Sequence, residues 1–191
     1  MRNIVFSFSL VLCSTLCSAA QDVAGMSIEY GPIFQAKVEK AETWRAKMPE
    51  NLKTVVLSFE VFEAPSIDGL GEARVIKTRF SPKAFGNLDA AASESIQNIV
   101  RLPGIKNPTK TITKVTVSGF QARRISFESE RYDGKLGAEF LIVYNERTST
   151  AYHLQLIFSK KPTLNPFGTL SLADEHTRAS NIVDTVRITS P

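Results

Sequence analysis

The spacing of apolar residues divides the first half of the chain into short segments of strand-like and helix-like pattern. Apolar and polar residues alternate over residues 55–63, and a second β-rich run covers residues 73–80. Both runs predict strands, because alternation is typical of a strand with one buried face. Turn-forming residues at 65–71 separate them, which predicts a hairpin with a long loop. Upstream, apolar residues at helical spacing predict a short charged helix over residues 35–48, ended by Pro49.

A second helix is predicted after this hairpin, where the apolar positions recur about every 3.6 residues. These positions are Leu88, Ala91, Ala92, Ile96, Ile99 and Val100. Asn87 or Asp89 can cap the first turn, because a short polar side chain accepts hydrogen bonds from the free backbone N–H groups there. Pro103 and Gly104 interrupt the pattern, so the helix is expected to end before them.

Strand-like segments dominate the second half of the chain. They cover residues 112–117, 121–130, 138–145 and 151–159. Asp133 and Gly134 form a typical tight-turn pair, which predicts a hairpin between the second and third segments. Residues 140–144 are apolar at every position, so this strand is expected inside the sheet. The last strand carries Tyr152, Leu154, Leu156 and Phe158 on one face and His153, Gln155 and Ser159 on the other.

A closing helix follows a proline- and glycine-containing loop at residues 162–168. Ser171 and Asp174 have the spacing of a capping box, and the helix is expected to run to Val186. Its packing positions are Leu172, Ala179, Ile182, Val183 and Val186. The order of elements predicts an α+β fold: a single domain over residues 21–191 with a mainly antiparallel sheet and helices packed on it.

The C-terminal half also resembles a known family. The segment Ser118-Gly119-Phe120-Gln121-Ala122-Arg123 turns into a strand, two paired strands follow, and the closing helix runs into residues 181–188. Residues 112–189 resemble the PsbP-like domains, which include exported bacterial relatives such as the DcrB-like proteins. The resemblance implies a PsbP-like sandwich of a kind that serves binding and accessory proteins without a shared active site.

Residues 1–20 have the pattern of a secretory signal peptide. Arg2 supplies the positive start, residues 4–16 are largely apolar, and Ser18-Ala19-Ala20 offers small residues for cleavage after Ala20. The apolar run is shorter than the roughly twenty residues that span a bilayer, so no membrane anchor is expected. Lipidation is disfavoured, because Cys13 and Cys17 both follow leucines.

Both cysteines lie inside this signal, so the mature chain would form no disulfide. It also contains no Asn-x-Ser/Thr glycosylation site, since Asn107 is followed by proline. A small secreted eukaryotic domain normally relies on disulfides. The predicted location is therefore the bacterial periplasm or the exterior.

Catalytic and metal-binding motifs were sought and not found. The sequence has no Gly-x-Ser-x-Gly, no His-Glu-x-x-His and no phosphate-binding Gly-x-x-x-x-Gly-Lys. We expect no catalytic residue, no metal site and no cofactor. His153 is interpreted as a surface residue, and His176, beside the apolar stripe of the closing helix, as a packed, hydrogen-bonded one. Glu128 and Glu130 are interpreted as solvated ion-pair partners of neighbouring arginines rather than as an acid–base pair.

The charge is unevenly distributed along the chain, although the net charge is only +4. No acidic residue occurs between Glu94 and Glu128. The bases in this interval are Arg101, Lys106, Lys110, Lys114, Arg123 and Arg124. They either form one patch that attracts an anionic partner or scatter over separate faces and keep the protein soluble. Trp44, the only tryptophan, is either an exposed binding residue or part of the core.

These patterns favour an exported, periplasmic protein that works by binding rather than catalysis. The first hypothesis is a protein-interaction role, as a subunit of an envelope complex or a toxin-neutralising immunity protein with an anionic or acidic partner surface. The alternative is a carrier of a small apolar or anionic ligand in a pocket between sheet and helices. A hydrolase is the least favoured class, and nucleic acid is not an expected partner. A flat basic surface would support the first, an apolar pocket the second and a convergent polar cleft the third.

Overall fold

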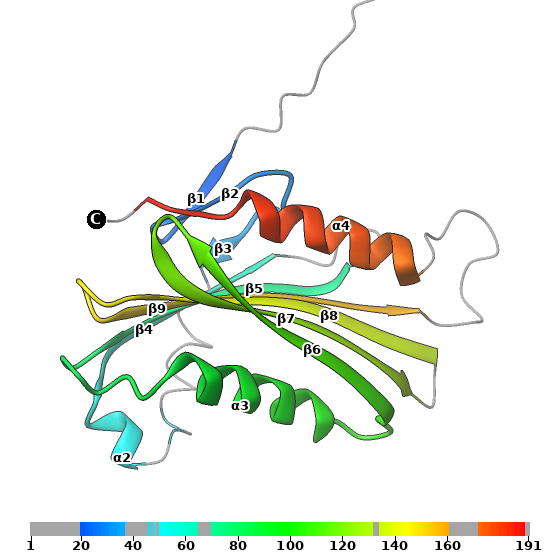
Figure 1. Ribbon diagram of the computed structural model, residues 1–191, viewed down its shortest axis with the longest axis horizontal. Coiled ribbons are helices and arrows are strands. Elements are labelled where there is room, and N and C mark those ends of the chain that lie inside the picture. Colours follow the sequence, from blue (N-terminus) through cyan, green and yellow to red (C-terminus); the bar gives the residue numbers. More distant parts are fainter. Residues whose placement is uncertain are drawn as a thin grey trace, which may run out of the picture.

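A seven-stranded antiparallel sheet forms the middle layer of the molecule, with one long helix on each face (Figure 1). The computed structural model describes residues 20–36, 46, 48, 50–64, 70–131, 134–160 and 172–189. The strands of this sheet are β3 (Gln35–Ala36), β4 (Val56–Ala64), β5 (Leu70–Phe80), β6 (Lys106–Val117), β7 (Phe120–Arg131), β8 (Gly134–Asn145) and β9 (Thr150–Lys160). The helices are α2 (Glu50–Lys53), α3 (Leu88–Val100) and α4 (Leu172–Thr185). The predicted α+β class is confirmed.

The strands lie in the order β3-β4-β5-β9-β8-β7-β6, and every neighbouring pair is antiparallel. The predicted hairpins β4–β5 and β7–β8 both form. Ser118 (φ 50°) and Gly119 (φ 84°) turn β6 into β7, and a tight hairpin turn of this kind needs positive φ at both positions. β8 lies inside the sheet, as its apolar residues 140–144 predicted.

Helix α3 covers one face of the sheet over β7 and β8. Its N-terminus is capped by Asn87, whose Oδ1 accepts a hydrogen bond from the Ala90 N–H at 2.6 Å. The buried helix residues are Leu88, Ala92, Ile96 and Ile99, and they pack on Ile125, Phe127, Ala138, Phe140 and Ile142 of the sheet. The helix predicted from Leu88 to Val100 is therefore confirmed, including its cap.

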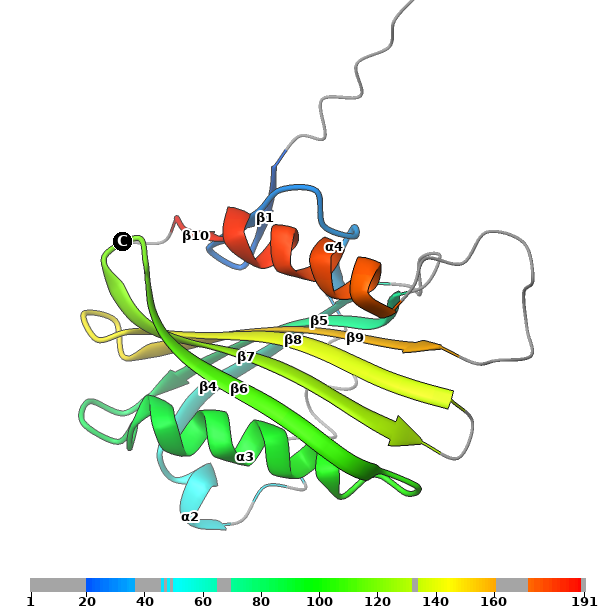
Figure 2. The same ribbon diagram turned by 45° about the vertical axis from the view of Figure 1, so that its right-hand side comes forward.

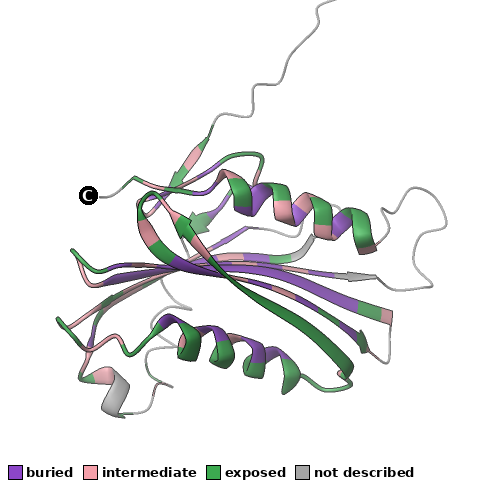
Figure 3. Cartoon of the chain, viewed as in Figure 1, coloured by how far each residue is buried: buried purple, intermediate pink, exposed green. Residues whose placement is uncertain are grey.

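Helix α4 covers the opposite face. Its buried residues Ala179, Ile182 and Val183 join Leu141 and Leu154 in a second core. Figure 3 shows both helices with their buried sides turned toward the sheet. The closing helix ends one residue before the predicted Val186, and Ser171 of the predicted capping box lies outside the described residues.

A second, three-stranded sheet was not predicted from the sequence. It consists of β1 (Gln21–Val23), β2 (Met26–Ile28) and β10 (Arg187–Ile188), so the two ends of the described chain pair with each other. Strands of two or three residues are too short to show a period. Val23, Met26 and Ile28 are buried in the same core as α4, which holds this sheet against the helix.

Two predicted boundaries were wrong. Gln35 does not start a helix: Gln35 and Ala36 form β3, paired with Glu63 and Phe62. Most of that predicted helix lies outside the described residues. β6 starts at Lys106 rather than Ile112, because its first half pairs with β7 through the backbone while its side chains stay exposed and show no alternation. No helix in the described part of the chain has both the length and the apolar character to cross a membrane.

Candidate functional site

A cavity of about 870 Å³ lies on the α3 side of the sheet. Helix α3 packs on β7 and β8, and the cavity extends from α3 over β9 and β5. Alternate residues of β5, β9 and β8 form its floor, because side chains of a strand point to opposite faces in turn. The apolar floor residues include Ile76, Ile157, Phe140 and Ile142. Ala91, Ser95, Asn98 and Ile99 of α3 form the opposing wall. Most of the described lining is apolar, which is typical of a small-molecule site.

Aromatic residues close the end of the cavity next to the start of α3. The rings of Phe80 and Phe85 meet edge to face with centroids 5.3 Å apart, and Phe85 stacks on Tyr144 at 4.1 Å. Phe85 belongs to the loop between β5 and α3, so this contact ties the loop to the sheet. The cavity therefore has a wall of packed aromatic rings at this end.

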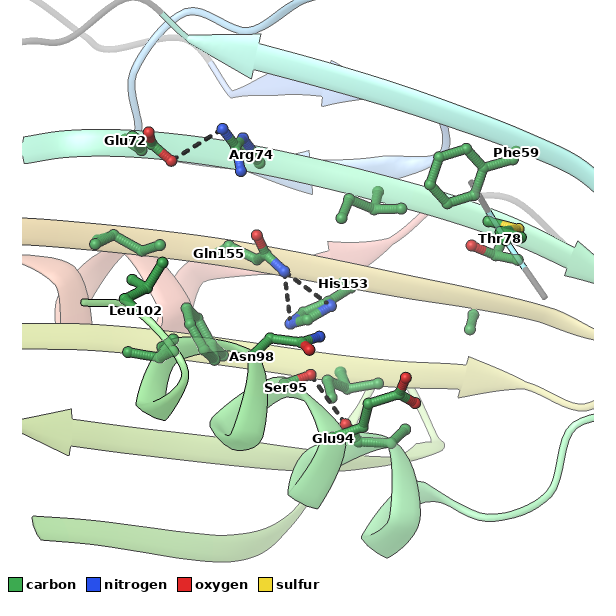
Figure 4. Close-up of a pocket in the computed structure, with 18 of the residues that line it drawn as sticks. Phe59, Glu72, Arg74, Thr78, Glu94, Ser95, Asn98, Leu102, His153 and Gln155 are labelled. Atoms are coloured by element: carbon green, nitrogen blue, oxygen red, sulfur yellow. Dashed lines mark hydrogen bonds and ion pairs between the residues drawn. The ribbon is translucent and has the colours of Figure 1, made fainter. Parts of the chain in front are cut away.

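His153 and Gln155 form a polar pair in the middle of the cavity floor. Both lie on β9, and Figure 4 shows their side chains in contact between β5 and α3. Gln155 Nε2 lies 3.3 Å from His153 Nδ1 and 3.4 Å from His153 Nε2. Phe140 packs edge to face on the histidine ring, with centroids 5.5 Å apart. His153 is half-buried, and desolvation lowers its pKa from 6.5 to about 4, so the ring is neutral at neutral pH.

The expectation that His153 is an ordinary surface histidine was wrong. The face of β9 that carries His153 and Gln155 was predicted to meet solvent, but it lines the cavity. The polar positions of β9 alone cannot show that this face lines a cavity, because α3, which forms the opposite wall, comes from a distant part of the sequence. Gln155 was not singled out at all.

Charged residues gather at the other end of the cavity. Arg74 lines it from β5, and its Nε donates to Glu63 Oε1 at 3.1 Å. Its Nη2 lies 2.9 Å from Glu72 Oε2. Arg131 of β7 also lines this end, and Glu94 of α3 lines the cavity farther from Arg74 and Glu72 (Figure 4). Arg74 is thus held between two carboxylates.

The groups at the cavity do not form a catalytic arrangement of a known kind. The described hydrogen-bond partner of His153 is Gln155, and the Ser95 hydroxyl donates to the Ala91 carbonyl at 2.9 Å. A nucleophile paired with a base therefore does not occur among these residues. Within the described chain, no group of three or more His, Cys, Asp or Glu side chains is placed to hold a metal ion.

A second polar cluster lies under α4, on the opposite face of the sheet. His176 Nδ1 lies 3.2 Å from Glu139 Oε1 and its Nε2 lies 2.9 Å from Glu128 Oε1. The ring also packs edge to face on Phe158. Arg124 joins Glu139 at 3.4 Å. The prediction of a packed, hydrogen-bonded His176 is confirmed, and Glu128 pairs with this histidine rather than with a neighbouring arginine.

The structure separates the six bases that were considered as one patch. Arg123 points to the α3 face, where its Nε and Nη2 bond both oxygens of Asp89 at 2.6 and 3.1 Å. This hydrogen bond lowers the pKa of Asp89 and raises that of Arg123. Arg124 points to the α4 face and bonds Asp184 at 2.7 Å. The two arginines thus form intramolecular ion pairs on opposite faces of the sheet. The alternation of strand side chains could have predicted this separation.

The other four bases are exposed. Arg101 caps the end of α3, and Lys106, Lys110 and Lys114 lie along β6 at the open edge of the sheet (Figure 2). Trp44 lies outside the described residues.

Comparisons with known proteins assign no family to the chain. No family model matches it, and no curated protein matches it either. A Pseudomonas aeruginosa protein of unknown function described as a putative regulator aligns with a TM-score of 0.43 and 15% identity, over 70% of this chain and 84% of that one. LpqN, involved in cell envelope biogenesis of Mycobacterium tuberculosis, gives 0.43 and 12%, over 86% and 71%. The Saccharomyces cerevisiae Ran-binding protein Mog1p gives 0.45 and 11%, over 87% and 91%. Similarity at this level names no ligand or partner, and the resemblance to PsbP-like domains stays a prediction.

Proposed function

We propose that this protein is a non-enzymatic binding protein that holds a small apolar ligand between α3 and the sheet. The observation that carries the proposal is the cavity of about 870 Å³ with its mainly apolar lining. Ligand sites in proteins typically have volumes of roughly 300–1,000 Å³, apolar walls and a few polar groups. Burial of a ligand's apolar surface in such a space supplies the binding free energy.

The proposal includes export and a single domain over residues 21–191. Export is supported by the signal-peptide pattern of residues 1–20. β1 begins at Gln21, directly after the proposed cleavage position, and pairs with β2. Cleavage after Ala20 would therefore leave the small sheet complete. The periplasm is the proposed location.

The ligand model can be tested with N-phenyl-naphthylamine, a neutral apolar dye whose fluorescence rises in apolar surroundings. Ser95 and Ser93 offer a matched pair on α3, because Ser95 lines the cavity and Ser93 is exposed. Ser95→Phe should fill the cavity and weaken dye binding about tenfold or more, a loss of about 1.4 kcal/mol of binding free energy. Ser93→Phe should bind the dye like the native protein.

A second substitution that fills the cavity keeps the test decisive if the Ser95→Phe protein does not fold. Thr78 lines the cavity from β5, so Thr78→Phe should reduce dye binding from the sheet side. Circular dichroism and thermal unfolding would verify that each variant is folded. The proposal is refuted if the native protein does not bind the dye, or if folded Ser95→Phe and Thr78→Phe proteins bind it as well as Ser93→Phe does.

Binding of an acidic protein surface is a second candidate, supported by the lysines of β6. Lys106, Lys110 and Lys114 are exposed on an edge strand that pairs only with β7 among the described strands. Lys106→Glu with Lys110→Glu changes this row without touching the Arg123–Asp89 ion pair, whereas the charge of Lys114 acts on Asp89. An envelope protein that the native form captures and the folded double variant loses would support this candidate. Equal capture by both would reject it.

A further inference from the structure

The polar groups of the cavity indicate which class of apolar ligand it accepts. The His153–Gln155 pair lies in the middle of the floor, because His153 pairs with Ile76 of β5 and Gln155 pairs with Arg74. Apolar side chains lie on both sides of the pair: Ile76 on β5, and Phe140 and Ile142 on β8. A ligand that fills the cavity therefore contacts these two polar side chains, with apolar residues around His153 and Arg74 beside Gln155.

The pair has hydrogen-bonding capacity left over. A neutral imidazole has one donor and one acceptor nitrogen, and a glutamine amide has two N–H donors and a carbonyl acceptor. Among the described residues, the ring nitrogens of His153 have Gln155 Nε2 as their hydrogen-bonding neighbour. One interaction between the two side chains leaves a donor and an acceptor available. A ligand group that both donates and accepts, such as a hydroxyl or an amide, matches this pair.

Acidic and basic residues are equal in number in the described lining of the cavity. The described lining contains two acidic residues, Glu72 and Glu94, and two basic ones, Arg74 and Arg131. Arg74 already bonds Glu72 and the buried Glu63. At neutral pH His153 is uncharged, so Arg74 and Arg131 carry the positive charges of the described lining, and they match Glu72 and Glu94 in number. Burial of a charged group without a partner is costly, so a carboxylate or ammonium group is disfavoured here.

We infer that the cavity selects an uncharged amphiphile, an apolar molecule with one hydroxyl or amide group that His153 and Gln155 bind. This inference rests on the proposed function and adds the chemical class of the ligand. Of the apolar and anionic ligands first considered for such a pocket, it favours the apolar one and disfavours the anion.

The test uses three molecules with the same alkyl chain, namely decanol, decanoate and decylammonium. Each competes with the bound dye at neutral pH and below the concentration at which it forms micelles. Decanol should displace the dye at a concentration about tenfold lower than either charged molecule. The dye signal itself reports whether the cavity binds apolar molecules at all.

Two variants connect this preference to the polar pair. Gln155→Leu should weaken decanol binding about fivefold, since one neutral hydrogen bond contributes about 1 kcal/mol, while dye binding is retained. Gln97→Leu is the matched control, because Gln97 is exposed on α3 and does not line the cavity. His153→Phe keeps an aromatic ring against Phe140 and should show the same loss as Gln155→Leu.

Failure of the two ideas would look different. Absence of dye binding by the native protein would overturn the proposed function. Dye binding with equal displacement by decanol and decanoate would overturn only the inferred ligand class. The same conclusion would follow if decanol bound equally well to native protein, Gln155→Leu and His153→Phe.

Discussion

Acid should destabilise this protein through His153, before its carboxylates are protonated. The pKa of His153 is lowered from 6.5 to about 4 in the folded protein by loss of hydration. Between these two values the unfolded chain binds a proton that the folded chain does not, so stability decreases as the pH falls. The loss begins near pH 6.5 and is complete once the pH falls through about 4. Each unit of pKa difference corresponds to about 1.4 kcal/mol, which gives about 3 kcal/mol for the full window.

A measurement near pH 5 separates this effect from that of the carboxylates. The pKa values of Asp22 and Asp89 are lowered by their hydrogen-bond partners, so both remain ionised there. Unfolding in urea at about pH 7 and about pH 5 should show a loss of about 2 kcal/mol from His153. His153→Gln should lose correspondingly less, because its side chain does not titrate.

Nuclear magnetic resonance measures the pKa of His153 directly. The chain contains two histidines, so a spectrum of His153→Gln assigns both ring signals. The His153 signal should titrate with a midpoint near 4. A midpoint at the ordinary value near 6.5, or equal pH dependence of unfolding in native and His153→Gln proteins, would show that the folded protein does not desolvate this ring.

Two further substitutions test the packing around the sheet. Gly137→Ala should reduce the free energy of unfolding by about 1–3 kcal/mol, because the added Cβ would lie 2.8 and 2.9 Å from carbons of the Phe158 ring. Gly86→Ala is the control: its Cβ meets no atom within 4 Å, so the variant should be nearly neutral in the same urea titration. Arg124→Leu should cost about 2 kcal/mol or more, because it deprives Glu139, whose side chain is only 5% exposed, of one charged partner. Adding Glu139→Leu should restore part of this loss, and a double variant as unstable as the single one would contradict the argument.

Much of the fold follows from local patterns. The alternation in residues 55–63 and 151–159 predicts β4 and β9, and the helical spacing from Leu88 to Val100 predicts α3 with its Asn87 cap. These segments are predictable because each buries one face, so apolar residues recur in the sequence with the period of the strand or the helix. β1 and β10 have no such period. β1 pairs with its neighbour β2, and β10 joins them because the two chain ends meet beside α4, where the Glu29 N–H bonds Thr185 more than 150 positions away.

The candidate site was predicted less well than the fold. A pocket between sheet and helices was considered as an alternative, but none of its residues was identified. His153 and Gln155 have the pattern of solvent-facing residues on β9, and only the position of α3 turns that face into a cavity floor. Conversely, Arg123 and Arg124 are adjacent in the sequence and were considered part of one basic patch. In the structure they form intramolecular ion pairs on opposite faces of β7.

The sequence by itself determined the fold class, most strands of the large sheet and the two long helices, and it contains none of the catalytic and metal-binding motifs considered. These depend on periodicity and on short motifs, which are local properties of the chain. The tertiary structure decided where α3 lies on the sheet, and therefore the cavity and the environment of His153. It also decided which aspartates pair with Arg123 and Arg124. Such properties depend on which distant side chains exclude water from one another, and no local pattern records that.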